Sequence, residues 1–513
     1  MATTLGPNLR TFHSTSARRH DTPRTVIDFI VANAARHQDR AALIVAGVQS
    51  ERCVSYGELA ASIAEVNAGF DAAGISRNAR VLVLAAPSLE FYTFALGVLA
   101  SGRVLVLVDG RMRRHRIAHA MNTAAPEVVI APRAVMRWWP LVGALRRARR
   151  FSVDGGMLGA QNANTVRVAG AAIGRLSPSA DAPAIVAFSS GSTGAAKQIV
   201  RSHAVLLAQH HALADAFPAP DGDVNLSGFP MAVLHNLCCG ATSVLPDTEL
   251  RAVVASDAGA TLRLIHRCRV TSVSAAPALA RAIARRANAD SAPLHRVTNL
   301  VVGGGPVSRA LCAEVLAAFP NARASVVYGA TEAEPIATVS MREVLVSRGD
   351  GFLVGRPVPA VEVLLDRSRC DTDAGEVLVR GPHVASDDWH RTGDAARIDT
   401  HGRLWLLGCV GDVVKHRDRV VIPSTLEAIA LSMRGVDVAA FVAHATAPEG
   451  ELAIELASTA DSIAVVTRLR DDLTRRGFST IPVRLVARIP MDARHESKVL
   501  RGELARLLER SAR

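Results

Sequence analysis

The chain has 513 residues, of which 49% are hydrophobic and 21% are charged, and its formal net charge is +12. This length allows two or more domains with sizeable cores, and the composition is that of a globular chain rather than a disordered one. Aromatic residues make up only 4% and the arginines are dispersed, so stacking platforms for nucleic acid are few, and we expect an anionic substrate or carrier instead.

Apolar runs, cysteine spacing and the amino-terminal residues indicate where in the cell the protein is expected. No apolar run approaches the roughly 20 residues of a membrane-spanning helix, so we expect no stable membrane insertion. The seven cysteines form no C-x-x-C pair and show no metal-ligand spacing with histidine, which predicts reduced thiols in a cytoplasmic protein. Residues 1–24 lack the apolar core of a secretory signal and are interpreted as a flexible leader.

Helices and strands alternate from residue 25 onward, which predicts parallel sheets with helices on their faces. Ser55 and Glu58 form a capping-box pattern at the start of one helix. The expected helices are 26–36, 56–73, 88–101 and 113–122, and the expected strands are 41–45, 80–84, 104–108 and 128–131.

A loop of small polar residues follows the next apolar strand, 184–187. Its glycines let the backbone N–H groups point outward, its hydroxyls add donors, and Lys197 adds a mobile positive charge, a combination that suits a polyphosphate. The loop does not match the G-x-x-x-x-G-K-[ST] pattern, and a Ser/Gly-rich surface turn is the alternative. The candidate phosphate-binding residues are Ser189, Ser190, Gly191, Ser192, Thr193, Gly194 and Lys197.

Lysine is rare in this chain. Of 59 basic residues only Lys197, Lys415 and Lys498 are lysines. An ammonium group is a compact, mobile donor that a rigid guanidinium does not replace. We therefore treat all three lysines as site candidates.

A second α/β series follows, with a helix at 202–217 and strands at 243–245, 271–274 and 300–302. The last strand runs into Gly304, Gly305 and Pro306, where a flat base could approach the backbone, although a simple tight turn is the alternative. The next strand ends at Tyr328 and Gly329, and Thr331 and Glu332 beyond it could contact a phosphate and its Mg²⁺.

Short strands at 361–365 and 375–380 predict a small β region, which residues 389–394 are expected to interrupt before a strand at 402–408. Lys415 then lies in a polar run that we take as a domain boundary. A polar loop, 492–498, precedes a terminal helix at 499–510.

In this order, the segments 189–197, 328–332, 391–394, 412–415 and Lys498 resemble the signature motifs of the adenylate-forming superfamily, which includes acyl-CoA synthetases, adenylation domains and luciferases. The resemblance spans roughly residues 25–510. It implies an α/β fold, with two α/β subdomains and a small β-barrel in a large domain (25–408) and a mobile α+β domain (409–513).

The resemblance also implies roles for single residues. The 189–197 loop would hold the ATP phosphates, Gly304 to Pro306 with Tyr328 and Gly329 would flank adenine, and Asp394 would bind the ribose. Thr331 would touch the α-phosphate, Glu332 and Thr193 would serve Mg²⁺, Lys415 would belong to the nucleotide site, and Lys498 would reach both the carboxylate and the α-phosphate. Phe229, Met231 and His235 would belong to the acid-binding wall, which is mostly apolar and favours an aliphatic acid.

The chain departs from the family pattern at three positions that bear on the second half-reaction, in which an acceptor displaces AMP from the acyl-adenylate. Cys409 stands where the family commonly has a ribose-contacting arginine, for which Arg403 or Arg417 could substitute. Gly411 and Asp418 stand where aspartate and glycine are common. These changes bear on rotation of the carboxyl-terminal domain.

Three functions follow. The first is an ATP- and Mg²⁺-dependent acid–thiol ligase that uses CoA or a carrier-protein pantetheine, with an acyl carrier protein as a partner. The second is a β-lactone synthetase, because the segments 328–336, 389–394, 402–405 and 492–498 look most similar to the β-lactone synthetases of bacterial olefin biosynthesis. The third is an impaired adenylate-binding protein.

Overall fold

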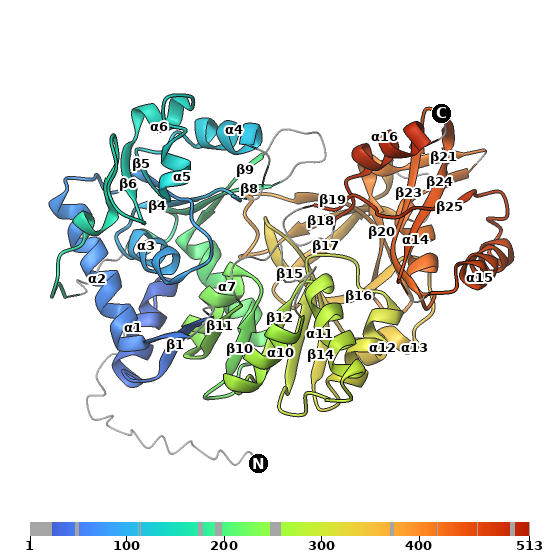
Figure 1. The fold of residues 1–513 in the computed structure, drawn as a ribbon, viewed down its shortest axis with the longest axis horizontal. Helices are drawn as coiled ribbons and strands as arrows, with labels where there is room; N and C mark the ends of the chain where they lie inside the picture. Colours follow the sequence, from blue (N-terminus) through green and yellow to red (C-terminus); the bar gives the residue numbers. More distant parts are fainter. Residues whose placement is uncertain are drawn as a thin grey trace, which may run out of the picture.

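The computed structural model describes residues 23–46, 51–110, 112, 114–172, 178–189, 197–246, 258–369, 374–417, 419–458, 460–492 and 498–511. The strands form three main sheets and one small hairpin, and helices cover the sheets (Figure 1). None of the helices in these residues is long and apolar enough to cross a membrane.

The first sheet is parallel except at one edge, where β8 and β9 form an antiparallel hairpin. Its central strands are continuous Val, Leu and Ile runs because both faces are covered. In sheet order its strands are β7 (Gln161–Asn162), β6 (Arg149–Ser152), β5 (Val128–Ala131), β3 (Arg80–Val83), β4 (Val104–Leu107), β8 (Pro183–Ser189) and β9 (Lys197–Ser202). The helices of this part of the chain are α2 (Tyr56–Ala72), α3 (Leu89–Ala100), α4 (Arg114–Ala124), α5 (Arg133–Met136) and α6 (Gly143–Arg147).

The capping box at the start of α2 is confirmed. The backbone N–H of Glu58 donates to the Ser55 hydroxyl at 3.2 Å, and the Glu58 carboxylate accepts from the Ser55 N–H at 2.8 Å. Two N–H groups that the first turn leaves without helical partners are thus satisfied.

The second sheet changes from parallel to antiparallel pairing at β14 and β15. In sheet order its strands are β17 (Glu362–Asp366), β18 (Gly375–Arg380), β19 (His390–Ile398), β20 (Leu404–Cys409), β16 (Phe352–Pro357), β15 (Ala333–Ser340), β14 (Arg323–Ala330), β13 (Asn299–Gly303), β12 (Ser272–Ala275), β10 (Val224–Ser227), β11 (Thr242–Leu245), β1 (Ala41–Val45) and β2 (Arg52–Ser55). The helices of this part are α1 (Val26–Arg36), α7 (His203–Ala216), α8 (Pro230–Cys239), α10 (Ala258–Arg267), α11 (Pro277–Ala289), α12 (Arg309–Ala318) and α13 (Met341–Val346).

One expectation about the small β region is wrong. Residues 389–394 were expected to interrupt it, but His390 begins β19, which pairs with β18 on one side and β20 on the other. The polar side chains of this segment find partners within the sheet, because Arg391 forms ion pairs with Asp366 on β17 and Glu376 on β18. A polar strand of this kind lacks the apolar alternation by which strands are predicted.

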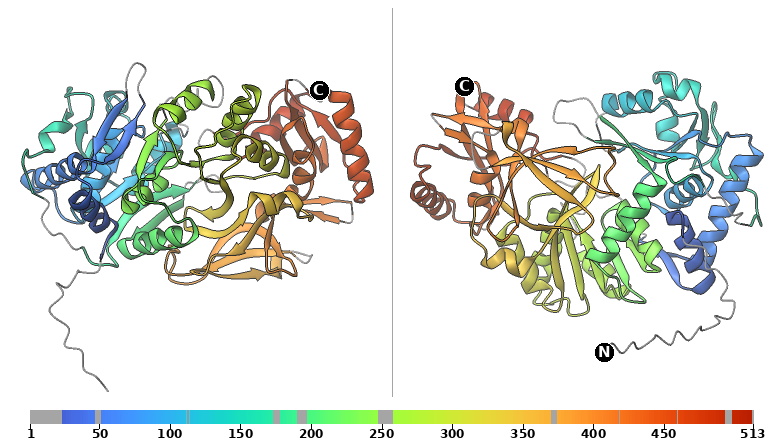
Figure 2. Two further views of the ribbon diagram at one scale, coloured as in Figure 1. Left: turned by 90° about the horizontal axis from the view of Figure 1, so that it is seen from below. Right: turned by 180° about the vertical axis from the view of Figure 1, so that it is seen from behind.

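The carboxyl-terminal part has its own sheet and hydrophobic core. Figure 2 shows it at one end of the molecule, away from the first sheet. Its strands are β23 (Val436–His444), β24 (Ala447–Leu456) and β25 (Val483–Leu485), its helices are α14 (Pro423–Leu431), α15 (Ser462–Arg475) and α16 (Arg501–Ser511), and β21 (Val414–His416) with β22 (Arg419–Val421) forms the hairpin that precedes them.

Candidate active site

The hairpin of β8 and β9 carries the predicted phosphate loop. Ser189 pairs with Lys197 across the two strands, so the loop between them is closed at its base. Lys197 is exposed at the first position of β9. Ser190, Gly191, Ser192, Thr193 and Gly194 lie outside the described residues, and their phosphate-binding role stays a prediction.

The carboxyl ends of β13 and β14 lie side by side, as parallel pairing requires. A Cβ atom at Gly303 would lie 2.5 Å from the Val327 side chain, so only glycine lets the two strands end this close together. Gly304 follows with a φ of +79°, which favours glycine, and its Cα faces the Phe229 ring. The predicted adenine segment and the start of the predicted acid wall therefore meet at the Gly304–Phe229 contact.

Tyr328 and Asp394 form the centre of the site. The Tyr328 hydroxyl on β14 donates a 2.8 Å hydrogen bond to the Asp394 carboxylate on β19. Burial raises the pKa of Tyr328, and the neighbouring Asp394 charge raises it further. Burial also raises the pKa of Asp394, while the Tyr328 hydrogen bond and the charge of Lys498 oppose this shift.

Lys498 comes to this centre from the carboxyl-terminal part of the chain. Its ammonium group lowers the pKa of Asp394 and acts in the same direction on the Cys409 thiol, which burial raises to about 11. The backbone of Lys498 is fixed by Asp492: its N–H donates to the Asp492 carboxylate and its C=O accepts from the Asp492 N–H, both at 2.8 Å. These two hydrogen bonds fix the backbone of Lys498, whose charge acts on the Asp394 end of the site.

Thr331 and Glu332 form the turn between β14 and β15. The Thr331 carbonyl accepts from the buried Arg201 guanidinium, and the Glu332 carbonyl accepts from the Ala385 N–H at 2.8 Å. The turn is therefore held by its backbone, which leaves the Thr331 hydroxyl and the Glu332 carboxylate as the groups that can meet a ligand.

His390 shows that the phosphate lysine and the predicted magnesium carboxylate share one region. Burial lowers the pKa of His390, Lys197 lowers it further, and Glu332 opposes the shift. Glu332 also acts on Asp394. Glu332 therefore lies within electrostatic reach of both His390 and Asp394, and Lys197 lies within reach of His390.

The Glu332 carboxylate fits a Mg²⁺ site by its chemistry, since this ion takes one or two carboxylates and fills the rest of its shell with water and phosphate oxygens. The cationic Lys197 nearby suits the phosphates that would accompany the ion. Glu332, with Thr193 from the loop, would hold Mg²⁺ here.

The structure also contains a residue that the sequence reasoning missed. Arg501, at the start of α16, forms ion pairs with Asp412 at 2.9 Å and Glu427 at 2.7 Å, and donates to the Phe441 carbonyl at 2.9 Å. Its charge lowers the pKa of Cys409. The signal in the sequence that could have pointed to Arg501 was its place as a charged residue three positions after Lys498.

Two further arginines were predicted as substitutes for the missing ribose contact. Arg403 is not one: it forms ion pairs with Asp399 and Glu343 and donates to the Ser347 hydroxyl at 3.1 Å. The guanidinium donors of Arg403 are thus engaged by these three residues and not by Asp394. Arg417 is exposed beside the β21–β22 hairpin and nothing links it to Asp394 in the described residues, while Asp418 lies outside them.

The described contacts do not join every predicted residue to this centre. Lys415 is exposed on β21, where its backbone pairs with Val420. A Cβ atom at Gly329 would lie 3.1 Å from the Glu334 side chain, a tight contact, while Gly305 and Pro306 lead into the N-cap of α12 at Ser308. Their nucleotide contacts stay predictions.

The predicted acid wall is the start of α8. Phe229 is its N-cap and Met231 packs against the core of the first sheet and its neighbouring helices. His235, which its mostly apolar surroundings in the sequence predict to pack rather than to act as a base, contacts the side chains of His210 and Cys239. The expectation that no cysteine has metal-ligand spacing with histidine is wrong for one pair, since His235 and Cys239 are four residues apart on α8 and their side chains are in contact.

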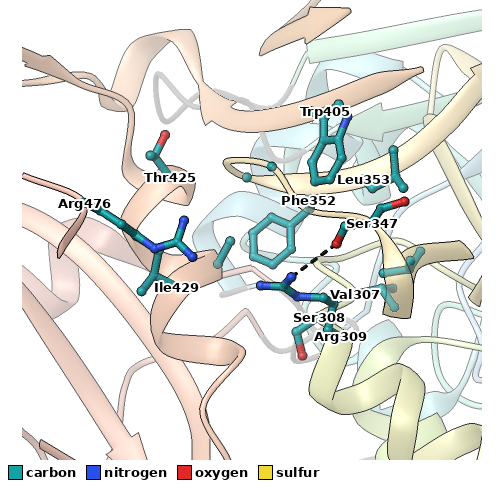
Figure 3. Close-up of a pocket in the computed structure, with 14 residues that line it drawn as sticks. Val307, Ser308, Arg309, Ser347, Phe352, Leu353, Trp405, Thr425, Ile429 and Arg476 are labelled. Carbon is teal, nitrogen blue, oxygen red and sulfur yellow. Dashed lines mark hydrogen bonds between the residues drawn. The ribbon is translucent and has the colours of Figure 1, made fainter. Parts of the chain in front are cut away.

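A separate hollow lies between the second sheet and the carboxyl-terminal part (Figure 3). Arg309 and Arg476 reach it from opposite sides, with Phe352 between them, and Arg309 donates to the Ser347 carbonyl at 3.2 Å. Burial lowers the pKa of Arg309, and the charges of Arg348 and Arg476 add to this shift. None of the predicted site residues lines this hollow.

The sequence of the chain is similar to those of a protein family and of known proteins. Residues 30–387 match the AMP-binding enzyme family, and the chain belongs to it. It is similar to an olefin beta-lactone synthetase of Stenotrophomonas maltophilia (strain K279a), with 30% identity over 511 residues, 88% of this chain and 90% of the relative. An olefin beta-lactone synthetase of Xanthomonas campestris pv. campestris is 28% identical over 407 residues, 69% of this chain and 71% of that protein.

Among solved structures, the fold resembles the O-succinylbenzoate coenzyme A synthetase from Bacillus subtilis, solved in complex with ATP and magnesium ion. The TM-score is 0.75 at 19% identity, covering 93% of this chain and 98% of that one. The expected α/β fold, with a large amino-terminal and a small carboxyl-terminal part, is thereby confirmed. The protein is an adenylate-forming enzyme.

Proposed function

We propose that this enzyme activates a 3-hydroxy aliphatic acid with ATP and Mg²⁺ and closes it to a β-lactone. The observation that carries the proposal is the 30% identity to an olefin beta-lactone synthetase over nine-tenths of that relative. Support also comes from the 389–394 and 492–498 segments, which carry part of the resemblance: they contain Asp394 and Lys498, and the charge of Lys498 acts on Asp394.

The first half-reaction joins the acid to the nucleotide. A carboxylate oxygen attacks the α-phosphorus, the bond to the β-phosphate breaks, and pyrophosphate leaves. Because two anions meet, positive charge has to be placed at the α-phosphate. Lys498 is available for this at the Asp394 end of the site, and Lys197 lies at the base of the phosphate loop. Bound Mg²⁺ would neutralise further phosphate charge.

The second half-reaction closes the ring. The 3-hydroxyl oxygen attacks the acyl carbon, the bond from that carbon to the AMP oxygen breaks, and the hydroxyl proton passes to a base. His390 suits that role because its lowered pKa leaves it neutral at pH 7, with a free lone pair. The hydroxyl belongs to the acyl chain itself, so the attack is effectively unimolecular.

Transfer to a thiol is the second candidate. It is favoured by the CoA ligases among the chain's relatives, such as the 2-succinylbenzoate–CoA ligase of Arabidopsis thaliana at 24% identity. In that alternative, the thiol of CoA or of a carrier-protein pantetheine would displace AMP. Lys415 would enter the nucleotide site after rotation of a carboxyl-terminal domain that begins at residue 409.

One experiment separates the two. The enzyme is incubated with ATP, Mg²⁺ and 3-hydroxy fatty acids of several chain lengths, with and without CoA, and the matched acids without the hydroxyl serve as controls. Ring closure gives many AMP per enzyme without thiol, and a product lighter than the acid by one water. Release of AMP that requires CoA and ignores the hydroxyl would establish the ligase instead.

A further inference from the structure

A cluster of two histidines and a cysteine lies between α7 and α8, and one of its members, His235, also belongs to the predicted acid wall. Nδ1 of His210 on α7 lies 3.0 Å from Nδ1 of His235 on α8, and Nε2 of His235 lies 3.6 Å from Sγ of Cys239. Taking one donor atom from each side chain, all three lie within 4.8 Å of one another.

The helical spacing of the cluster is that of a metal site. His235 and Cys239 are four residues apart on α8, so their side chains lie on one face of the helix. Two ligands at i and i+4 are the arrangement by which a helix supplies a zinc ion. His210 adds a third donor from the neighbouring helix, and the Phe29 ring of α1 packs edge-on against it at 4.7 Å.

The protonation states suit metal binding. Burial lowers the pKa of His210 to about 4 and that of His235 to about 3, and the neighbouring imidazoles add to both shifts. Both rings are therefore neutral at pH 7, the form in which imidazole binds a metal. Burial raises the pKa of Cys239 to about 11, so the thiol keeps its proton until a cation displaces it.

We propose that His210, His235 and Cys239 form a three-ligand Zn²⁺ site. The Zn–N and Zn–S bond lengths of about 2.1 and 2.3 Å imply ligand atoms roughly 3.3 to 3.6 Å apart. Side-chain rotations that move the donor atoms by about 1 Å would bring them from their present positions to these separations. Binding exchanges the Cys239 proton for the ion and leaves the fourth position to a water molecule. His235 would use one ring nitrogen and release its other contact.

The site joins two helices that frame the candidate active site. α7 follows β9 directly, and β9 begins at Lys197; α8 begins at Phe229, beside Gly304. A bound ion would fix α7 to α8 and stabilise the folded chain by an amount that grows with the logarithm of the free ion concentration above its Kd. This inference does not depend on which acceptor the enzyme uses.

Cobalt supplies a direct test. The purified full-length protein, stripped with a chelator, is titrated with Co²⁺ and then with Zn²⁺. We expect about one ion per chain, visible bands of tetrahedral cobalt, and a near-ultraviolet thiolate-to-cobalt band that Zn²⁺ abolishes. A rise in melting temperature on adding Zn²⁺ should accompany binding. A titration of the unmodified protein without the thiolate band overturns the proposal by itself.

Variants assign the ligands. Cys239→Ser should lose the thiolate band, and His210→Asn and His235→Asn should each weaken Co²⁺ binding at least about tenfold, the loss typical of a disrupted metal site. His211→Ala and Cys268→Ser are matched controls, since both lie outside the three ligands, and should bind like the unmodified protein. Binding that survives all three ligand variants, or that fails equally in the controls, contradicts the assignment.

Discussion

The Tyr328 hydroxyl and the Asp394 carboxylate are joined by a 2.8 Å hydrogen bond between β14 and β19, which are separated by three other strands in the order of the second sheet. The bond stabilises the ionised form of a carboxylate that burial would otherwise protonate more readily. Asp394 can accept hydrogen bonds from ribose hydroxyls most strongly when it is ionised.

Tyr328→Phe should therefore change the pH dependence of the enzyme. Without the hydrogen bond the pKa of Asp394 rises further above its ordinary value, so the carboxylate is lost at a higher pH as the solution is acidified. The acid limb of kcat/KM for ATP should move to higher pH by about 1 unit, the size of one hydrogen bond to a charged group. ATP–pyrophosphate exchange measured from pH 5 to pH 8 tests this.

Tyr92→Phe is the matched control, because Tyr92 is also buried but lies on α3 in the first α/β unit. An acid limb that stays in place in Tyr328→Phe would show that Asp394 does not control nucleotide use.

Much of this fold was predictable because its helices and strands carry local signals. The Ser55–Glu58 pair marks the start of α2, and the Val and Leu runs of β3 to β5 mark buried parallel strands. β19 was missed because its polar residues are satisfied by Arg391 ion pairs with two neighbouring strands, and partners that distant in sequence give no local pattern.

The site was predictable to the extent that motifs carried it. Of the predicted residues, Tyr328 and Asp394 are joined by a hydrogen bond and Lys498 acts electrostatically on Asp394, while their roles toward the nucleotide stay predictions. The His210–His235 contact joins helices whose packing no spacing in the sequence encodes. The division at residue 408 and the roles of Lys415 and the loop 190–196 stay predictions.

Lys498→Ala should nearly abolish acyl-adenylate formation and leave ATP binding in place. The lysine lies at the Asp394 end of the site, and a preorganised charge at a phosphate in the transition state is worth about 10²- to 10³-fold in rate. ATP–pyrophosphate exchange gives the rate, and equilibrium binding of ATP gives the affinity. Exchange near the unmodified level would remove Lys498 from the chemistry.

Lys197→Ala should weaken productive binding of ATP more than binding of the acid. Lys197 closes the base of the phosphate loop and acts electrostatically on the Glu332–His390 region. Separate KM values for ATP and for the acid measure the two effects, and Lys197→Arg, which keeps the charge in a bulkier and rigid form, should recover only part of the loss. An increase confined to the KM of the acid would show that the loop is misassigned.

Arg501 links the lysine loop to the segment that follows β20, and its removal should act on both stability and catalysis. Arg501→Ala leaves the buried Glu427 carboxylate without its ion pair, so the free energy of unfolding should fall by about 3 kcal/mol. Asp412→Asn leaves the Glu427 pair intact and should cost less stability. It weakens the ion pair that joins the start of α16, beside Lys498, to the segment after β20, and should lower the rate of adenylate formation. Arg506→Ala, an exposed residue of the same helix, is the control and should change neither quantity. Denaturant unfolding and ATP–pyrophosphate exchange on the three variants separate the two roles. A loss of rate in Asp412→Asn without a matching loss of stability would identify the Asp412–Arg501 pair as the contact that positions Lys498. Rates that follow stability across the series would show that Arg501 has a structural role only.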